Sequence, residues 1–213
     1  MDAPRLKSSP NNRLEAIFQA LQDAHLDAAE QSQTSLNRMP EYFMAVRVAD
    51  HFARHFRNFG YRLEPQVKQT FEDSDLWHSA SEELGKDPDL RPDGRFDLVL
   101  RTGKRNRPAH VLEFKRGGKL EALSHDLRRL AAVCRHAGTE RLKTNYLVFT
   151  RKCRGTAAGD EQDIERLRST LADLEGIQGS VHASDPLTPF INRHQERVSG
   201  AAFRVIVVEL KAI

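Results

Sequence analysis

The stretch HVLEFKRGGKL, residues 110–120, places two charged side chains inside a run that otherwise has the composition of a buried strand. Side chains of a strand alternate in direction, so Glu113 and Lys115 share one face, and we expect Leu112 and Phe114 on the other face to enter the core. A buried charge is costly unless it is paired or solvated. The pattern therefore leaves two interpretations: a Glu-Lys pair on a solvated strand face, or a functional site on a central strand.

A second acidic residue stands in the preceding predicted strand, residues 95–100, within the stretch GRFDLVL. The two strands are expected to form an antiparallel hairpin. A register that opposes Asp97 to Glu113 also opposes Leu100 to His110 and makes residues 101–109 the turn. The sequence does not fix this register, but it would place two carboxylates and Lys115 on one patch.

Two adjacent carboxylates repel each other, so we expect one of them to be protonated or a cation to lie between them. Hard oxygen ligands with open positions suit Mg²⁺ or Mn²⁺. Such a metal lowers the pKa of a bound water and neutralises charge at an attacked phosphate. A neighbouring ammonium group can orient that water or stabilise the transition state. This is the chemistry of phosphodiester hydrolysis.

Periodicity along the rest of the chain predicts an α/β fold with a mixed central sheet flanked by helices. The chain has 213 residues, enough for one domain with extensions. The predicted helices are 12–31, 40–58, 119–137 and 160–176, and the predicted strands are 61–71, 95–100, 109–115, 144–150 and 203–211. A polar excursion, residues 72–92, separates the first two strands.

The stretches GRFDLVL and HVLEFKRGG, followed by a helix that contains HDLRRLA, resemble the core of the PD-(D/E)XK nuclease superfamily. The resemblance implies a restriction-endonuclease-like core in the order helix, three antiparallel strands, helix and strand. That order covers residues 40–150 within a nuclease-like domain at 40–213, preceded by a tail and helix at 1–39.

The resemblance also implies roles for individual residues. Asp97 and Glu113 would hold the metal, the Phe114 carbonyl would join them, and Lys115 would activate or orient the water. The Pro-Asp dipeptide that gives the family its name is displaced here, because Asp93 lies four residues before Asp97. Asp93 is therefore a weaker rival for the aspartate position.

Many members of the family add a glutamate from the helix before the first strand, and two candidates exist. Glu41 follows Pro40 in the first turn of the helix that leads directly into the first strand, which favours it over Glu15, one helix earlier. An ordinary explanation remains open for Glu41, because the helix dipole favours an acid in a first turn. A second E-x-K triplet, Glu209 and Lys211, is interpreted as a decoy because no crossover helix follows it.

Basic residues gather around the motif, although the net charge is only +3. They are either solvated loops or contacts to nucleic-acid phosphates. His125 and Arg129 also lie on the polar side of the helix after the motif. The candidates for phosphate contact are Arg101, Lys104, Arg105, Arg107, Arg116, Lys119 and Arg128.

These patterns together predict a cytoplasmic, Mg²⁺- or Mn²⁺-dependent endonuclease that acts on DNA, with RNA left open as a substrate. A homodimer is also left open, because double-strand cutters with one site often pair. The alternatives are a nuclease-fold binding module without cleavage activity, and a nuclease subunit of a larger restriction or transposition complex. No membrane span or signal peptide is expected, and Cys134 and Cys153 are expected as thiols in a reducing compartment.

Overall fold

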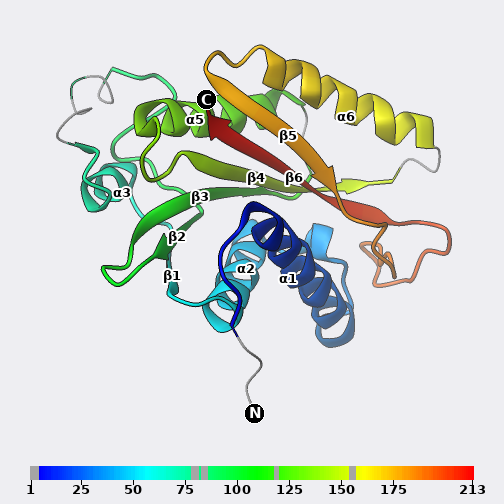
Figure 1. Ribbon diagram of the computed structural model, residues 1–213. Coiled ribbons are helices and arrows are strands. Elements are labelled where there is room, and N and C mark those ends of the chain that lie inside the picture. Colours follow the sequence, from blue (N-terminus) through cyan, green and yellow to red (C-terminus); the bar gives the residue numbers. More distant parts are fainter. Residues whose placement is uncertain (1–4, 78–81, 83–85, 118–119, 154–156) are drawn as a thin grey trace.

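The computed structural model describes residues 5–77, 82, 86–117, 120–153 and 157–213, and it shows a six-stranded mixed sheet flanked by helices (Figure 1). The predicted α/β class is thereby confirmed. The strands lie in the order β1-β2-β3-β4-β6-β5, and neighbours are antiparallel except for the parallel pair β3 and β4. The strands are β1 Phe59–Leu63, β2 Leu98–Thr102, β3 Arg107–Lys115, β4 Thr144–Lys152, β5 Ile177–Ala183 and β6 Phe203–Ala212. The helices are α1 Pro10–Gln31, α2 Glu41–His55, α3 Val67–Asp73, α5 Leu120–Ala137 and α6 Ala157–Ala172, with a 3₁₀ turn η1 Leu36–Arg38.

Helices cover both faces of the sheet (Figure 1). Leu112 and Phe114 pack in the cluster beneath α1 and α2, as the alternation predicts, while Val111 packs in the cluster beneath α3, α5 and α6. Glu113 shares the Val111 face and is only 2% exposed. The first interpretation, a Glu-Lys pair on a solvated strand face, is therefore wrong.

The N-terminal helix contributes to the same core as the sheet. Ile17 and Leu21 of α1 are fully buried in one cluster with α2 and the strands. A backbone bridge joins Leu6 to Phe56, which ties the segment before α1 to the end of α2. Within residues 5–39, α1 thus packs against α2 on one face of the sheet.

The predicted strand at 61–71 is wrong in its second half. β1 ends at Leu63, and α3 begins at Val67. Pro65 cannot donate a ladder hydrogen bond, and the positive φ of Glu64 (49°) turns the chain. Val67 and Phe71, which also fit a strand pattern, are four residues apart and are both buried on one face of a short helix.

The second predicted helix, 40–58, ends early. α2 stops at His55 because Phe56 adopts an extended conformation (φ −107°, ψ 148°). The residues that follow lead into β1, which includes Gly60. A Cβ at Gly60 would lie 2.6 Å from Oδ1 of the exposed Asn106 side chain, which would have to move to make room for it.

The pairing of β2 with β3 follows the predicted hairpin register as far as Leu100, but the turn differs from the predicted one. Leu98 pairs with Leu112 and Leu100 pairs with His110. A register shift then follows Leu100, so β2 continues to Thr102 and β3 begins at Arg107. The turn is therefore shorter than the predicted 101–109, and Gly103 adopts the positive φ (78°) that this tight connection requires.

Strand β5 was not predicted. Its sequence, IQGSVHA, lacks a clean alternation of apolar and polar residues. The strand forms an edge of the sheet and pairs only with β6. Gly179 lets α6 approach closely, since a Cβ there would lie 2.8 Å from Leu171 Cδ2. The other predicted helices correspond to α1, α5 and α6 with shifted ends.

Cys134 and Cys153 are not joined in a disulfide. Within the described part of the chain, none of the helices is long and apolar enough to cross a membrane.

Candidate functional site

The C-terminal end of β3 brings the predicted acidic residues together. Asp97 lies immediately before β2, one step beyond the Leu98–Leu112 pair, which places it beside Glu113. Its Oδ2 accepts a hydrogen bond from the Phe114 backbone N–H at 2.7 Å. This bond fixes the Asp97 carboxyl against the strand that carries Glu113 and Lys115.

Burial and mutual repulsion disturb the ionisation of this pair. Burial raises the pKa of Glu113 well above its usual range, and the charge of Asp97 adds to the effect. Burial likewise raises the pKa of Asp97, although the hydrogen bond from Phe114 opposes this. The two carboxyls are close enough for each to influence the pKa of the other. Without a metal ion between them, the pair therefore favours a state with a bound proton over two full charges.

Arg129 of α5 reaches the same pair from the helix above. Its Nη1 lies 3.0 Å from Glu113 Oε1, its Nη2 donates to the Arg95 carbonyl at 2.6 Å, and its guanidinium lies 4.8 Å from the centre of the Phe96 ring. Arg129 therefore turns inward, contrary to its predicted place on the polar side of the helix. The contact with Glu113 does not have hydrogen-bond geometry, so Oε1 is a buried oxygen without a hydrogen bond among the described residues.

Lys115 is surrounded by acids. Its Nζ lies 3.4 Å from Asp126 Oδ2 and 3.8 Å from Glu41 Oε2. Burial lowers the pKa of Lys115, but the charges of Asp126, Asp97, Glu41 and Glu113 outweigh this, and the net pKa is raised. Lys115 is consequently a fixed ammonium that can donate hydrogen bonds and stabilise negative charge, and it is poorly suited to act as a base.

Glu41 joins the cluster from the first turn of α2. Its Oε1 accepts a hydrogen bond from the Arg116 backbone N–H at 3.0 Å while its Oε2 faces Lys115. Glu15, the rival third acid, is an exposed residue of α1. Of the two candidates, the structure places Glu41 at the end of β3. Asp93, the rival for the aspartate position, is exposed in a turn.

Asp126 is the member of the cluster that sequence reasoning missed. It is 7% exposed and lies on the apolar face of α5, three residues after Leu123 and four before Leu130, both of which are fully buried. A carboxylate within a buried helical stripe needs a partner. The position of Asp126 within the apolar stripe could therefore have indicated a buried ion pair. Lys115 is its partner in the structure.

The donors around Glu113 can be compared with the needs of a metal ion. Among the described residues, no group of three or more histidine, cysteine, aspartate or glutamate side chains is arranged to hold a metal. Asp97 and Glu113 form a two-carboxylate pair, which is the usual protein contribution to Mg²⁺, since waters and substrate phosphate supply the other ligands. The adjacent carboxyls and the orphaned Glu113 Oε1 fit such a site, and the Arg129 guanidinium lies 3.0 Å from that oxygen.

Several of the basic residues predicted to contact phosphate are already paired with acids. Arg101 is 8% exposed and also donates from Nε to the Asn106 carbonyl at 2.6 Å, so its guanidinium supports the hairpin. The pairs are Arg101 with Asp73 at 2.7 Å, Arg107 with Asp75, and Arg128 with Asp89 at 3.7 Å.

The other predicted basic residues differ in exposure and position. Lys104 and Arg105 are exposed at the tip of the β2–β3 turn, and Arg116 is exposed next to Lys115. Lys119 lies outside the described residues. Lys104, Arg105 and Arg116 are thus the described candidates with exposed side chains that face no ion-pair partner among the described residues.

The second E-x-K triplet lies on the opposite face of the sheet. Glu209 of β6 accepts a hydrogen bond from the Tyr146 hydroxyl at 3.1 Å, and that hydroxyl accepts one from Arg13 Nε at 2.7 Å. Tyr146 packs with α1 and α2, so Glu209 belongs to the face that Glu113 does not share. The two triplets are separate sites.

Comparisons of the chain with protein-family models, curated proteins and solved structures gave no significant match. Function is therefore inferred from the site.

Proposed function

We propose that the chain is a Mg²⁺-dependent nuclease of the PD-(D/E)XK type that hydrolyses phosphodiester bonds in DNA. One observation carries the proposal: Asp97, Glu113 and Lys115 meet at the C-terminal end of β3, where burial raises the pKa of both carboxyls. Burying two carboxyls that repel each other costs folding free energy, and a structural role alone does not explain that cost. Strongly perturbed carboxyls beside a fixed cation are typical of catalytic clusters.

The order of elements supports the proposal. α2 precedes the antiparallel strands β1, β2 and β3, and α5 then connects β3 to the parallel strand β4. This is the order that the resemblance implies for a restriction-endonuclease-like core, with α3 inserted between β1 and β2. A likeness of fold does not specify activity, so the proposal depends on the residues at the site.

In this proposal, Asp97, Glu113 and the Phe114 carbonyl would hold the metal. Mg²⁺, when bound, would lower the pKa of a water and neutralise charge on the phosphate. Lys115 donates hydrogen bonds to the attacking water or to a phosphate oxygen. Asp126 and Glu41 hold the Lys115 ammonium in place and keep it charged.

A second candidate function is a nucleic-acid-binding module without cleavage activity. The observation that favours it is the closure of the site, since Glu113 is 2% exposed and Arg129 already lies 3.0 Å from its carboxyl. Cleavage requires that Arg129 withdraw from Glu113 or share it with a metal. A third possibility lies between these two: a nuclease subunit in which Arg129 withdraws from Glu113 only after assembly into a larger complex.

The experiment that tests the proposal measures cleavage of linear, supercoiled and single-stranded DNA and of RNA in Mg²⁺, Mn²⁺ or EDTA. We expect cleavage of DNA with either metal and none in EDTA. Lys115→Ala, purified in parallel, identifies contaminating nucleases, because its preparation should lack the activity. Nucleic-acid binding without cleavage in every metal condition would favour the binding module.

A further inference from the structure

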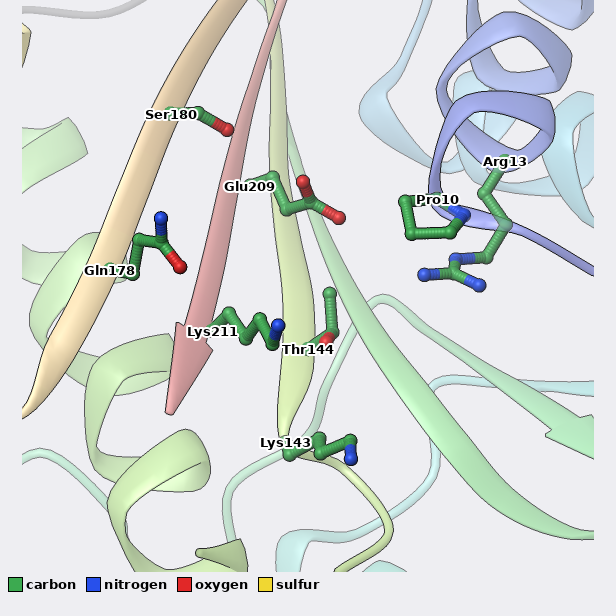
Figure 2. Close-up of a pocket in the computed structure, with 8 residues that line it drawn as sticks. All are labelled: Pro10, Arg13, Lys143, Thr144, Gln178, Ser180, Glu209 and Lys211. Atoms are coloured by element: carbon green, nitrogen blue, oxygen red, sulfur yellow. The ribbon is translucent and has the colours of Figure 1, made fainter. Parts of the chain in front are cut away.

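A polar pocket lies on the face of the sheet opposite Glu113, between the start of α1 and the adjacent ends of β4, β6 and β5 (Figure 2). Its cavity measures about 330 Å³. We call it the Arg13 pocket and define it by Arg13, Lys143, Thr144, Ser180, Glu209 and Lys211. The cavity is near the lower end of the range of small-molecule sites, roughly 300–1,000 Å³.

The lining of the Arg13 pocket is predominantly cationic. Arg13, Lys143 and Lys211 contribute three positive charges, against the single carboxylate of Glu209. Within the described chain, neither Lys143 nor Lys211 forms an ion pair, and both side chains are exposed. A pocket with this balance attracts anions, and the field is strongest where the low-dielectric protein walls concentrate it.

Arg13 is held rigidly at the pocket wall. It is 8% exposed, its Nε donates to the Tyr146 hydroxyl at 2.7 Å, and its Nη1 donates to Ser8 Oγ at 2.9 Å. Its Nη2 has no hydrogen-bond partner among the described residues, and the guanidinium extends from α1 toward the sheet (Figure 2). A pre-positioned guanidinium loses little side-chain entropy when it binds a phosphate or carboxylate.

Glu209 adds a second requirement to the ligand. Its Oε1 accepts from the Tyr146 hydroxyl, and its side chain points from β6 toward α1 (Figure 2). A carboxylate beside an anionic ligand repels it, and a hydrogen-bond donor on the ligand offsets that repulsion. The hydroxyls of Thr144 and Ser180 complete a wall that suits a hydroxylated molecule.

We propose that the Arg13 pocket binds a hydroxyl-bearing phosphate monoester. The phosphate contacts Arg13, Lys143 and Lys211, because a phosphate dianion offers enough acceptor oxygens for three cationic donors. A ligand hydroxyl donates to Glu209. The pocket and the Glu113 cluster lie on opposite faces of the sheet, so this site is additional to the proposed cleavage site.

The test measures binding of ribose 5-phosphate by calorimetry at constant ionic strength, with ribose, inorganic phosphate and a 5′-phosphorylated oligonucleotide as comparison ligands. We expect ribose 5-phosphate to bind the full chain and ribose to give no signal. Tighter binding of ribose 5-phosphate than of the oligonucleotide identifies a small ester as the ligand. Tighter binding of the oligonucleotide that is lost when Lys143 and Lys211 are both changed to alanine identifies a strand terminus, the other source of a phosphate monoester.

Variants separate the pocket from general attraction of anions to a basic protein. Lys143→Ala with Lys211→Ala should weaken ribose 5-phosphate binding at least tenfold, because both exposed lysines can change without disturbing the core. Lys68→Ala on α3, a lysine with a 53% exposed side chain in an exposed ion pair, should leave the affinity unchanged. Equal affinity in the double variant and in wild type, or no binding of any phosphate ester, would overturn the proposal.

The Glu209→Gln variant tests the hydroxyl contact. Loss of the carboxylate removes repulsion of inorganic phosphate and weakens the contact with a ligand hydroxyl. We therefore expect the preference for ribose 5-phosphate over inorganic phosphate to shrink. An unchanged preference would remove Glu209 from the proposed ligand contacts.

Discussion

The chain contains two E-x-K triplets on strands of one sheet, and their surroundings differ. Glu113 and Lys115 on β3 lie beneath α5 among further acids, with Glu113 2% exposed. Glu209 and Lys211 on β6 line an open polar pocket with Arg13. The same three-residue pattern thus occurs once in an acidic, buried cluster and once in a cationic pocket.

The difference shows that residues from other elements determine the chemistry of each triplet. Asp97, Asp126 and Glu41 raise the pKa of Lys115 and concentrate negative charge where a divalent cation would bind. At the second triplet, Arg13 supplies positive charge where an anion would bind.

The largest expected effect is on cleavage by the first triplet. Lys115→Ala should lower the rate of DNA cleavage in Mg²⁺ by about 10²–10³-fold, because it removes a fixed donor that stabilises the transition state. Lys211→Ala, the equivalent change in the second triplet, should change the rate by less than about twofold. Initial rates on supercoiled DNA measure both, and equal losses in the two variants would contradict the separation of the triplets.

A second effect concerns the pH dependence of stability. The raised pKa values of Glu113 and Asp97 mean that the folded state binds protons more tightly than the unfolded state does. The contribution of each carboxyl to stability is therefore fully present below the unfolded pKa and is lost as the pH rises through the folded pKa.

We consequently expect Glu113→Gln to melt at a higher temperature than wild type at neutral pH, and the difference to shrink in acid. Each 1 kcal/mol of unfolding free energy shifts the melting temperature by about 2–4 °C for a chain of this size. Asp97→Asn should show the same trend. Melting curves in EDTA between pH about 4 and about 8 test this, and a difference that does not vary with pH would contradict the assignment of a protonated pair.

A third effect is stabilisation by metal. A cation that binds only the folded state raises its stability by about 1.4 kcal/mol when its concentration is ten times the Kd. This corresponds to a melting temperature about 3–6 °C higher in Mg²⁺ than in EDTA. Asp97→Asn should remove the shift, whereas Glu209→Gln should retain it. An equally large rise in the melting temperature of Asp97→Asn would show that the metal binds elsewhere than at β3.

The smallest expected effect is on the salt dependence of DNA binding. Lys104 and Arg105 are the exposed basic residues of the β2–β3 turn. Reversing both charges should flatten the slope of log affinity against log salt by about 2, one unit for each lost phosphate contact. Arg54→Glu, at a residue with a 75% exposed side chain at the end of α2, is the control that should leave the slope unchanged. An unaltered slope in the turn variant would show that Lys104 and Arg105 do not contact phosphate and serve only solubility.

The part of the site that the sequence predicted is the part that depends on local geometry. Strand alternation placed Glu113 and Lys115 on one face, and the hairpin register that brings Asp97 beside them follows from pairing across one turn. The position of Glu41 followed from the order of α2 and β1.

The missed features depend on packing between distant elements. Asp126 and Arg129 turn toward β3 because α5 crosses that strand, which local periodicity does not reveal. The second half of the strand predicted at 61–71 is the helix α3, because Val67 and Phe71 fit both the strand and the helix period and are buried together against the sheet. The pocket that Glu209 and Lys211 line was not predicted, because Arg13, which forms its other wall, lies about 200 residues earlier in the chain.

The most direct test of the account compares glutamate-to-glutamine changes in the two triplets. DNA cleavage should be measured for wild type, Glu113→Gln and Glu209→Gln, each in Mg²⁺ and in EDTA. We expect cleavage by Glu113→Gln to fall to the EDTA background and Glu209→Gln to retain the wild-type rate. Metal-dependent cleavage at the wild-type rate by Glu113→Gln would contradict it.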